Sequence, residues 1–138
     1  MKKILFLFVL GVVLSCKQNI TDADISNLNG YWEIEKVELP DGDKKEYKVN
    51  ETIDFFKIEA NKGFRKKVMP QLDGTYLTND IQEDVVVVVK NGDALLQYKT
   101  KYASWKEEII ELTKDKLVVK NQQEIEYYYK RPAKFSVK

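Results

Sequence analysis

Short runs of β-branched and aromatic residues alternate along most of this chain with turn signals that contain glycine, asparagine or aspartate. These signals lie at residues 41–43, 61–63, 73–74, 91–93, 114–116 and 121–124. Glycine and asparagine tolerate the positive φ that tight hairpins require. Turn signals about ten residues apart are typical of an all-β sandwich or barrel. Parallel strands would need long crossovers that this spacing leaves no room for, so we predict antiparallel strands in up-and-down order.

The runs between the turn signals define the predicted strands. They are residues 30–39, 52–60, 63–69, 74–78, 82–90, 94–102, 105–113, 116–121 and 124–131. No other window has a convincing helical stripe, although residues 24–28 are compatible with one helical turn. The sequence therefore predicts an all-β domain of about eight to nine strands.

Alternation of apolar and polar residues assigns a face to several of these strands. The faces expected to point inward hold Leu96, Tyr98 and Tyr102 in one strand and Ile125, Tyr127 and Tyr129 in another. In 105–113, Ile110 and Leu112 lie opposite the face that holds Glu107, Ile109 and Glu111.

Two strands depart from simple alternation. In the first strand the apolar positions change phase near Glu35 and Lys36, which indicates a β-bulge where the strand bends. The run Val85 to Val89 carries no face information. It indicates either a strand covered on both sides or an aggregation-prone strand guarded by flanking charges.

The first residues of the chain are typical of a targeting signal. Lys2 and Lys3 precede an apolar stretch that is too short to span a bilayer, so residues 1–15 are interpreted as a signal peptide. Ser15-Cys16 at its end resembles the lipobox of bacterial lipoproteins, and Cys16 is the only cysteine. The resemblance implies cleavage before Cys16 and attachment of lipid to its sulfur. An ordinary signal peptide or an N-terminal anchor with an incidental cysteine is the alternative.

The lipobox resemblance also implies a location. A lipid-anchored chain belongs to the cell envelope, and Lys17 is not the aspartate that retains many lipoproteins at the inner membrane, so the outer membrane is favoured. The leaflet is left open. Residues 16–28 are then a lipidated N-terminus and a polar tether, and residues 29–138 form the folded domain.

The start and end of the predicted domain carry a second resemblance. Gly30-Tyr31-Trp32 resembles the G-x-W start of the lipocalin superfamily, and Arg131 follows the last strand as a basic residue does there. Small lipocalin-like lipoproteins of Bacteroidetes are similar to this arrangement. The resemblance covers roughly residues 29–132 and implies an up-and-down β-barrel in which Arg131 packs over Trp32. The other lipocalin motifs are missing, and an open sandwich or partial barrel with Trp32 as ordinary core is the alternative.

Composition excludes several classes of function. The chain has no histidine, which removes Ser-His and Cys-His catalysis and histidine metal sites. Lys and Arg number 23 against 22 Asp and Glu, so binding of nucleic acid by bulk charge is not expected. The acidic pairs lack the spacing of a calcium loop. We therefore expect neither an enzyme nor a bound metal or cofactor.

Two functions remain from the residues and the resemblance. In the first, the barrel binds a small apolar or amphipathic molecule between the candidate lining residues Phe64, Leu96, Tyr98, Tyr127 and Tyr129. In the second, the barrel is filled, and the protein has a structural role or contacts another envelope protein or the cell wall through its surface. The cluster Arg65-Lys66-Lys67 is interpreted as a solvated strand edge, with lipid headgroup contact as the alternative.

Overall fold

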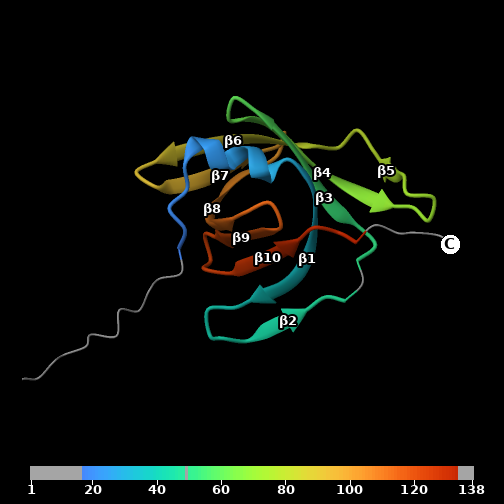
Figure 1. Cartoon of the computed structure of the whole chain (residues 1–138), viewed down its shortest axis with the longest axis horizontal. Helices are drawn as coiled ribbons and strands as arrows, with labels where there is room; N and C mark the ends of the chain where they lie inside the picture. The colour runs from blue at the N-terminus through green and yellow to red at the C-terminus, as the bar shows by residue number, and fades with distance from the viewer. Residues whose placement is uncertain (1–16, 49, 134–138) are drawn as a thin grey trace, which may run out of the picture.

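The computed structural model describes residues 17–48 and 50–133, and these form one antiparallel sheet closed into a barrel (Figure 1). Before the first strand lies a short 3₁₀ helix, η1 (Asp22–Leu28). The strands are β1 (Gly30–Glu38), β2 (Lys44–Glu46), β3 (Ile53–Glu59), β4 (Lys62–Pro70), β5 (Tyr76–Thr78), β6 (Glu83–Lys90), β7 (Asp93–Lys99), β8 (Ser104–Leu112), β9 (Lys116–Asn121) and β10 (Glu126–Lys130). No helix in these ranges is long and apolar enough to cross a membrane.

The barrel is closed by pairing between its first and last strands. The ring runs β1-β3-β4-β6-β7-β8-β9-β10, and β10 pairs with β1. β2 and β5 stand outside the ring, where β2 pairs with the end of β1 and β5 with the end of β4 (Figure 1). The predicted all-β, antiparallel barrel is confirmed, and each predicted strand overlaps an observed one. β2 was missed because its residues are all charged and show no apolar alternation.

Two β-bulges set the faces of the strands. The expected bulge in β1 is confirmed, because its register with β10 shifts between Ile34 and Lys36. A second bulge was not anticipated and shifts the register of β8 against β9 between Ile109 and Glu111. It brings both Ile109 and Leu112 into the core, so the assignment of Ile109 to the face opposite Leu112 was wrong.

The N-terminal segment is part of the folded domain rather than a tether. The amide of Gln18 donates to the carbonyl of Ile110 and that of Ile20 to the carbonyl of Gly92, both at 2.9 Å. Ile20 is 1% exposed, and Ile25 and Leu28 of η1 are buried as well. The folded domain therefore begins before residue 29, where we predicted its start. Three isolated apolar residues are enough to dock the otherwise polar N-terminal segment on the barrel.

The core fills the half of the barrel next to η1 and extends to Tyr98 in the mouth half. Its buried side chains are Ile20, Ile25, Leu28, Trp32, Phe56, Ile58, Val85, Val87, Ala94, Leu96, Tyr98, Ile109, Leu112, Leu117 and Val119. Val86 and Val88 on the opposite face of β6 are each 38% exposed, so this strand is covered on one side only. The mouth of the barrel lies at the other end, where the turns β7–β8 and β9–β10 are found.

Candidate functional site

Trp32 and Arg131 close the barrel at the end covered by η1. The Trp32 side chain is fully buried, and its Nε1–H donates to the carbonyl of Leu28 at 2.8 Å. The guanidinium carbon of Arg131 lies 3.6 Å from the Trp32 ring centroid, within the range of a cation–π contact. The structure thus brings together the two residues that the lipocalin resemblance paired.

Hydrogen bonds fix the Arg131 guanidinium in this position. It donates to the carbonyls of Asn27 at 2.7 Å, Lys114 at 2.8 Å and Tyr31 at 2.9 Å. Gly30 has φ +107°, and a Cβ there would lie 3.2 Å from Nη1 of Arg131. Glycine is required at this position for both its backbone conformation and the approach of the arginine.

The five residues expected to line a ligand site separate into three groups. Tyr98, Tyr127 and Tyr129 point into the barrel, where Tyr127 and Tyr129 line an open pocket at the mouth. Leu96 also points inward but is fully buried in the filled half. Phe64 lies on the outer face, so its expected place inside the barrel was wrong.

The register of β4 explains the position of Phe64. Phe64 pairs with Lys57 and shares the outer face with it, while the next residue, Arg65, pairs with Phe56 of the core. The Phe64 ring packs against Phe55, with ring centroids 6.2 Å apart. The outer aromatic cluster continues through Tyr31, which lies 4.8 Å from Phe55 and stacks on Tyr76 at 4.0 Å.

Arg65 is the main functional candidate that sequence reasoning missed. It was interpreted as part of a solvated edge, but its side chain is 11% exposed and lies inside the barrel. The guanidinium donates to both carboxylate oxygens of Glu83, at 2.7 and 2.8 Å, and lies 4.2 Å from the Tyr98 ring centroid. The only signal in the sequence was that Phe64 and Arg65 are neighbours in one strand and must therefore face opposite sides of the sheet. We assigned Phe64 to the inside and Arg65 to the outside, and the structure shows the reverse.

A second buried charge, Glu107 of β8, faces the same interior. Its carboxylate Oε1 is 3.7 Å from Nη1 of Arg65, and the residue is 7% exposed. Neither that oxygen nor the buried Tyr98 hydroxyl has a well-aligned hydrogen bond among the described residues. The hydroxyl faces Glu107, which raises the pKa of Tyr98 further, so a small shift of either side chain lets the hydroxyl donate to the carboxylate.

Burial changes the acidity of these groups. It raises the pKa of Glu107 above its usual value, with Arg65 acting in the opposite direction. It also raises the pKa values of Tyr98 and Tyr129 well above the usual range of tyrosine. Burial opposes the charge of Arg65, but its anionic and phenolic neighbours raise its pKa overall. The tyrosine hydroxyls therefore stay neutral and Arg65 stays charged.

The mouth pocket is an open hollow of about 480 Å³ between β1, β3, β10 and the segment that follows β2. Its walls include Trp32, Ile34, Val37, Tyr47, Asn50, Glu51, Thr52, Ile53, Asp54, Lys67, Tyr127 and Tyr129. Asp54 is 2% exposed, and its Oδ1 lacks a well-aligned hydrogen bond although Nζ of Lys67 lies 2.6 Å away. Aromatic walls with one buried carboxylate suit a molecule that is apolar over most of its surface and polar at one end.

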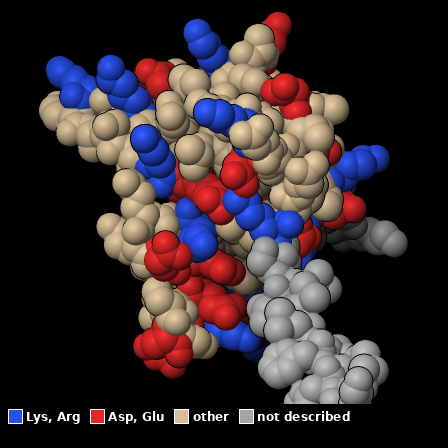
Figure 2. All heavy atoms as spheres, turned by 90° about the vertical axis from the view of Figure 1, so that its left-hand side faces the viewer, with Lys and Arg blue, Asp and Glu red and all other residues tan. Residues whose placement is uncertain are grey.

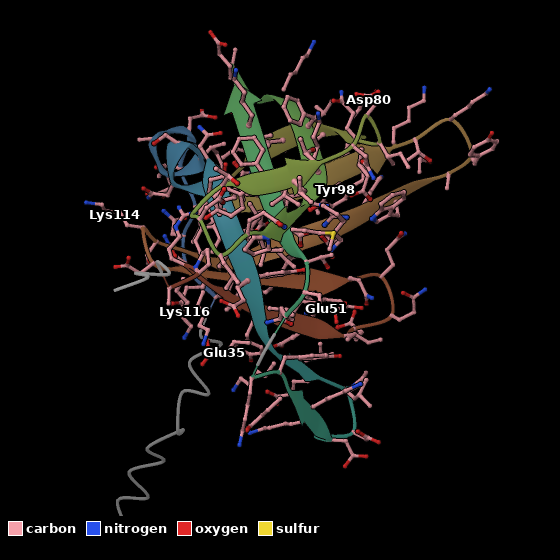
Figure 3. The ribbon with its side chains drawn as sticks, turned by 90° about the vertical axis from the view of Figure 1, so that its right-hand side faces the viewer. Glu35, Glu51, Asp80, Tyr98, Lys114 and Lys116 are labelled. Atoms are coloured by element: carbon pink, nitrogen blue, oxygen red, sulfur yellow. The ribbon has the colours of Figure 1, made fainter. Side chains whose placement is uncertain are left out.

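A second hollow lies between β6, β7 and β8. It has a volume of about 560 Å³ and is bordered by Tyr98, Trp105, Lys99 and Lys106 among others. Tyr98 and Trp105 stack with ring centroids 5.4 Å apart. Figure 3 shows Tyr98 within the barrel, while Lys114 and Lys116 lie at the end that carries η1. Arg65 pairs with Glu83 at the start of β6, and Glu107 pairs with Asn121 at the end of β9, so the polar interior lies in the mouth half of the barrel.

The described part of the chain contains no candidate metal site, and the face shown in Figure 2 carries charges of both signs. Residues 17–48 and 50–133 contain no cluster of three or more metal-ligating His, Cys, Asp or Glu side chains. On the face shown in Figure 2, acidic and basic side chains are interspersed. Lys17 pairs with Asp93 and, at 3.1 Å, with Glu108. Cys16, the expected lipid site, lies outside the described residues.

Comparison with known proteins places the chain among similar barrels. A family model for the lipocalin-like domain matches residues 28–119. A lipocalin-like protein from Bacteroides uniformis has 12% sequence identity and a TM-score of 0.50, over 77% of this chain and 99% of its own. An uncharacterized protein from Bacteroides eggerthii has 14% identity and a TM-score of 0.50, over 76% and 99%. No curated protein matches the sequence significantly.

Proposed function

Since the chain belongs to the lipocalin-like domain family, we propose that it binds a small amphipathic molecule in the mouth pocket of its barrel. The observation that carries the proposal is the open hollow of about 480 Å³ lined by Trp32, Tyr127 and Tyr129. Eight-stranded barrels have room for one small ligand when side chains leave part of the interior empty. Here the half next to η1 is packed, so the ligand occupies the mouth half only.

Polar groups in this half orient the ligand. The Tyr127 hydroxyl accepts a hydrogen bond from Nδ2 of Asn121 at 3.2 Å and still has its own proton to donate. Tyr129 borders the same pocket, close to Asp54. An apolar portion of the ligand would pack on the rings, and a polar end would meet the hydroxyls and the carboxylate.

Native mass spectrometry of protein isolated from its own membranes tests the proposal. We expect a bound species of small mass that is reduced or lost in a Tyr127→Phe/Tyr129→Phe double variant, since only two hydroxyls are removed. Lys130→Ala is the matched control, because it alters an exposed residue of the same strand. A chain without any bound species, whose double variant is also more stable, would favour a packed barrel without a ligand.

The second candidate function is protein interaction in the envelope. The observation that favours it is the outer aromatic cluster of Tyr31, Phe55, Phe64 and Tyr76, which is only partly buried by β5. Aromatic side chains are enriched at protein interfaces. Loss of cross-linking to envelope proteins in a Phe64→Ser variant, with ligand occupancy unchanged, would favour this function.

We also propose that the chain is a lipoprotein anchored through Cys16, at the outer membrane. The lone cysteine at the end of the apolar leader supports this, as does the docking of the residues that follow. Lys17 pairs with Glu108 and Gln18 bonds to β8, so an anchor at Cys16 joins the barrel directly at its η1 end. The mouth would then face away from the membrane.

Labelling of cells with radioactive palmitate tests the anchor. We expect label in the native chain and none in Cys16→Ala, with the leader left uncut in the variant. Label that persists in Cys16→Ala would contradict the lipoprotein assignment. Retention in inner-membrane fractions would contradict the outer-membrane location.

A further inference from the structure

The interior of the mouth half contains more buried carboxylates than buried cations. Asp54, Glu83 and Glu107 have side chains that are 3%, 20% and 9% exposed. Arg65, the one buried cation among them, is 11% exposed. Lys67, which pairs with Asp54, is 62% exposed and so lies mostly in solvent. An incompletely neutralised buried anion is costly in a medium of low dielectric.

The buried carboxylates differ in how closely a positively charged side chain approaches them. Arg65 directs two short hydrogen bonds at Glu83 and only a long contact of 3.7 Å at Glu107. Oε1 of Glu107 and Oδ1 of Asp54 are buried and accept no well-aligned hydrogen bond among the residues the structure describes. Nζ of the mostly exposed Lys67 lies 2.6 Å from Oδ1 of Asp54, and Glu107 faces the neutral Tyr98 hydroxyl. Both atoms are carboxylate oxygens, which accept hydrogen bonds and cannot donate them when ionised. A further partner for either atom would therefore be a donor.

Aromatic rings line the pocket that Asp54 borders. Tyr127 and Tyr129 border the mouth pocket, and Asp54 and Glu107 are both near enough to Tyr129 to raise its pKa further. Faces of aromatic rings attract cations, and the attraction grows when the cation leaves water. A carboxylate of a fatty acid would instead face buried anions with like charge.

From this combination we propose that the preferred ligand of the mouth pocket is an organic cation, a protonated amine with an apolar tail. The inference rests on the proposed small-molecule function and names the class of molecule. The amine would donate to Asp54 and approach Glu107, with its tail against Trp32 and the tyrosine rings. Lys67 supplies a weaker cation to Asp54 in the empty pocket and would move into solvent when the ligand binds.

Three probes with the same alkyl tail and different ends test this inference. They are decylamine, decanol and decanoate, each titrated at pH 7 into the folded chain without its leader while tryptophan fluorescence is recorded. We expect decylamine to bind about tenfold more tightly than decanol, equivalent to about 1.4 kcal/mol, and decanoate to bind weakest. Decanol reports on the pocket itself, since it carries no charge.

Variants identify the groups responsible for the preference. Glu107→Gln and Asp54→Asn should each reduce the preference of the chain for decylamine over decanol, and both are nearly isosteric. Glu111→Gln is the control, because Glu111 pairs with Lys116 on the outer face. Lys67→Met should tighten decylamine binding, since its cation no longer competes for Asp54. Circular dichroism confirms that each variant is folded before titration.

The outcomes separate the inference from the function on which it rests. Equal affinity for all three probes, or a preference for decanoate, overturns the amine inference and leaves small-molecule binding in place. Binding of none of the probes overturns both. A preference for decylamine that survives in both Glu107→Gln and Asp54→Asn also contradicts the inference, because the selectivity then arises elsewhere.

Discussion

Substitution of Arg131 by alanine tests the closure of the barrel. The guanidinium donates to three backbone carbonyls at 2.7 to 2.9 Å and lies 3.6 Å from the Trp32 ring centroid. A hydrogen bond from a charged donor contributes about 1.5 kcal/mol at the lower end of its range, which applies to this partly exposed side chain. In the variant, water can donate hydrogen bonds to some of the carbonyls that Arg131 leaves, and this recovers part of the lost stability. We therefore expect Arg131→Ala to reduce the free energy of unfolding by about 2–4 kcal/mol.

A double-mutant cycle with Trp32 isolates the contact between the two side chains. Trp32→Ala should cost about 3–5 kcal/mol, as large aromatic truncations in cores do. The double variant should cost less than the sum by about 0.5–2 kcal/mol, which is the range of a cation–π contact. Arg131→Lys retains the positive charge and loses the planar guanidinium with its several donors. Its free energy of unfolding should therefore lie between those of the native chain and Arg131→Ala.

Urea unfolding followed by circular dichroism measures these differences at one pH. Lys130→Ala is the control, since this exposed neighbour should change stability by no more than about 0.5 kcal/mol. A coupling energy of zero between Trp32 and Arg131 would refute the cation–π argument. A cost for Arg131→Ala as small as that of Lys130→Ala would refute the role of the three hydrogen bonds as well.

Three further predictions follow from positions that the structure corrects or adds. Ile20→Ala should cost about 2–4 kcal/mol in urea unfolding, because the side chain is 1% exposed, whereas in a free tether it would cost nothing. Phe64→Ala should reduce stability by about 1–2 kcal/mol without changing ligand affinity, since the ring lies on the outer face. Glu107→Gln should remove a pH dependence. Because the folded-state pKa of Glu107 is raised, its contribution to stability is present below the unfolded value near 4.5 and is lost as pH rises through the folded value. The native chain should thus lose stability relative to Glu107→Gln over that interval, and parallel pH profiles of the two chains would contradict this.

The architecture could be predicted from the sequence because each hairpin carries its own local signal. Turn residues at 61–63 and 91–93 mark positions where the chain adopts positive φ, as Asn61 and Asn91 do at 62° and 52°. The change of apolar phase near Glu35 likewise predicted the observed bulge of β1. Such signals depend on neighbours in the chain and need no knowledge of distant contacts.

Features that depend on contacts between distant residues were not predictable. Docking of Ile20 depends on the opening at the η1 end and on the close approach of Asn19 to Gly92, where a Cβ would lie 1.9 Å from Oδ1. The bulge in β8 leaves no mark in composition, because Ile109 and Ile110 are equally apolar. In both cases the burial of a side chain is set by a partner far away in sequence.

The largest error of the sequence interpretation falls on the proposed binding site. Alternation places a hydrophobic residue inward, and in β4 that rule selects Phe64 over Arg65. In the structure Arg65 faces the interior instead, together with Glu107 of β8. Burial of these charged groups has a desolvation cost that a leucine or a phenylalanine would avoid. Positions at which a protein departs from the usual pattern of apolar residues inside and charged residues outside are often functional sites. If the charged interior had no part in the choice of ligand, a variant with Arg65, Glu83 and Glu107 replaced by apolar residues of similar volume would still prefer decylamine over decanol to the same extent. We expect such a variant to remain folded and to show a weaker preference for the amine over decanol, because it lacks Glu107 and retains Asp54.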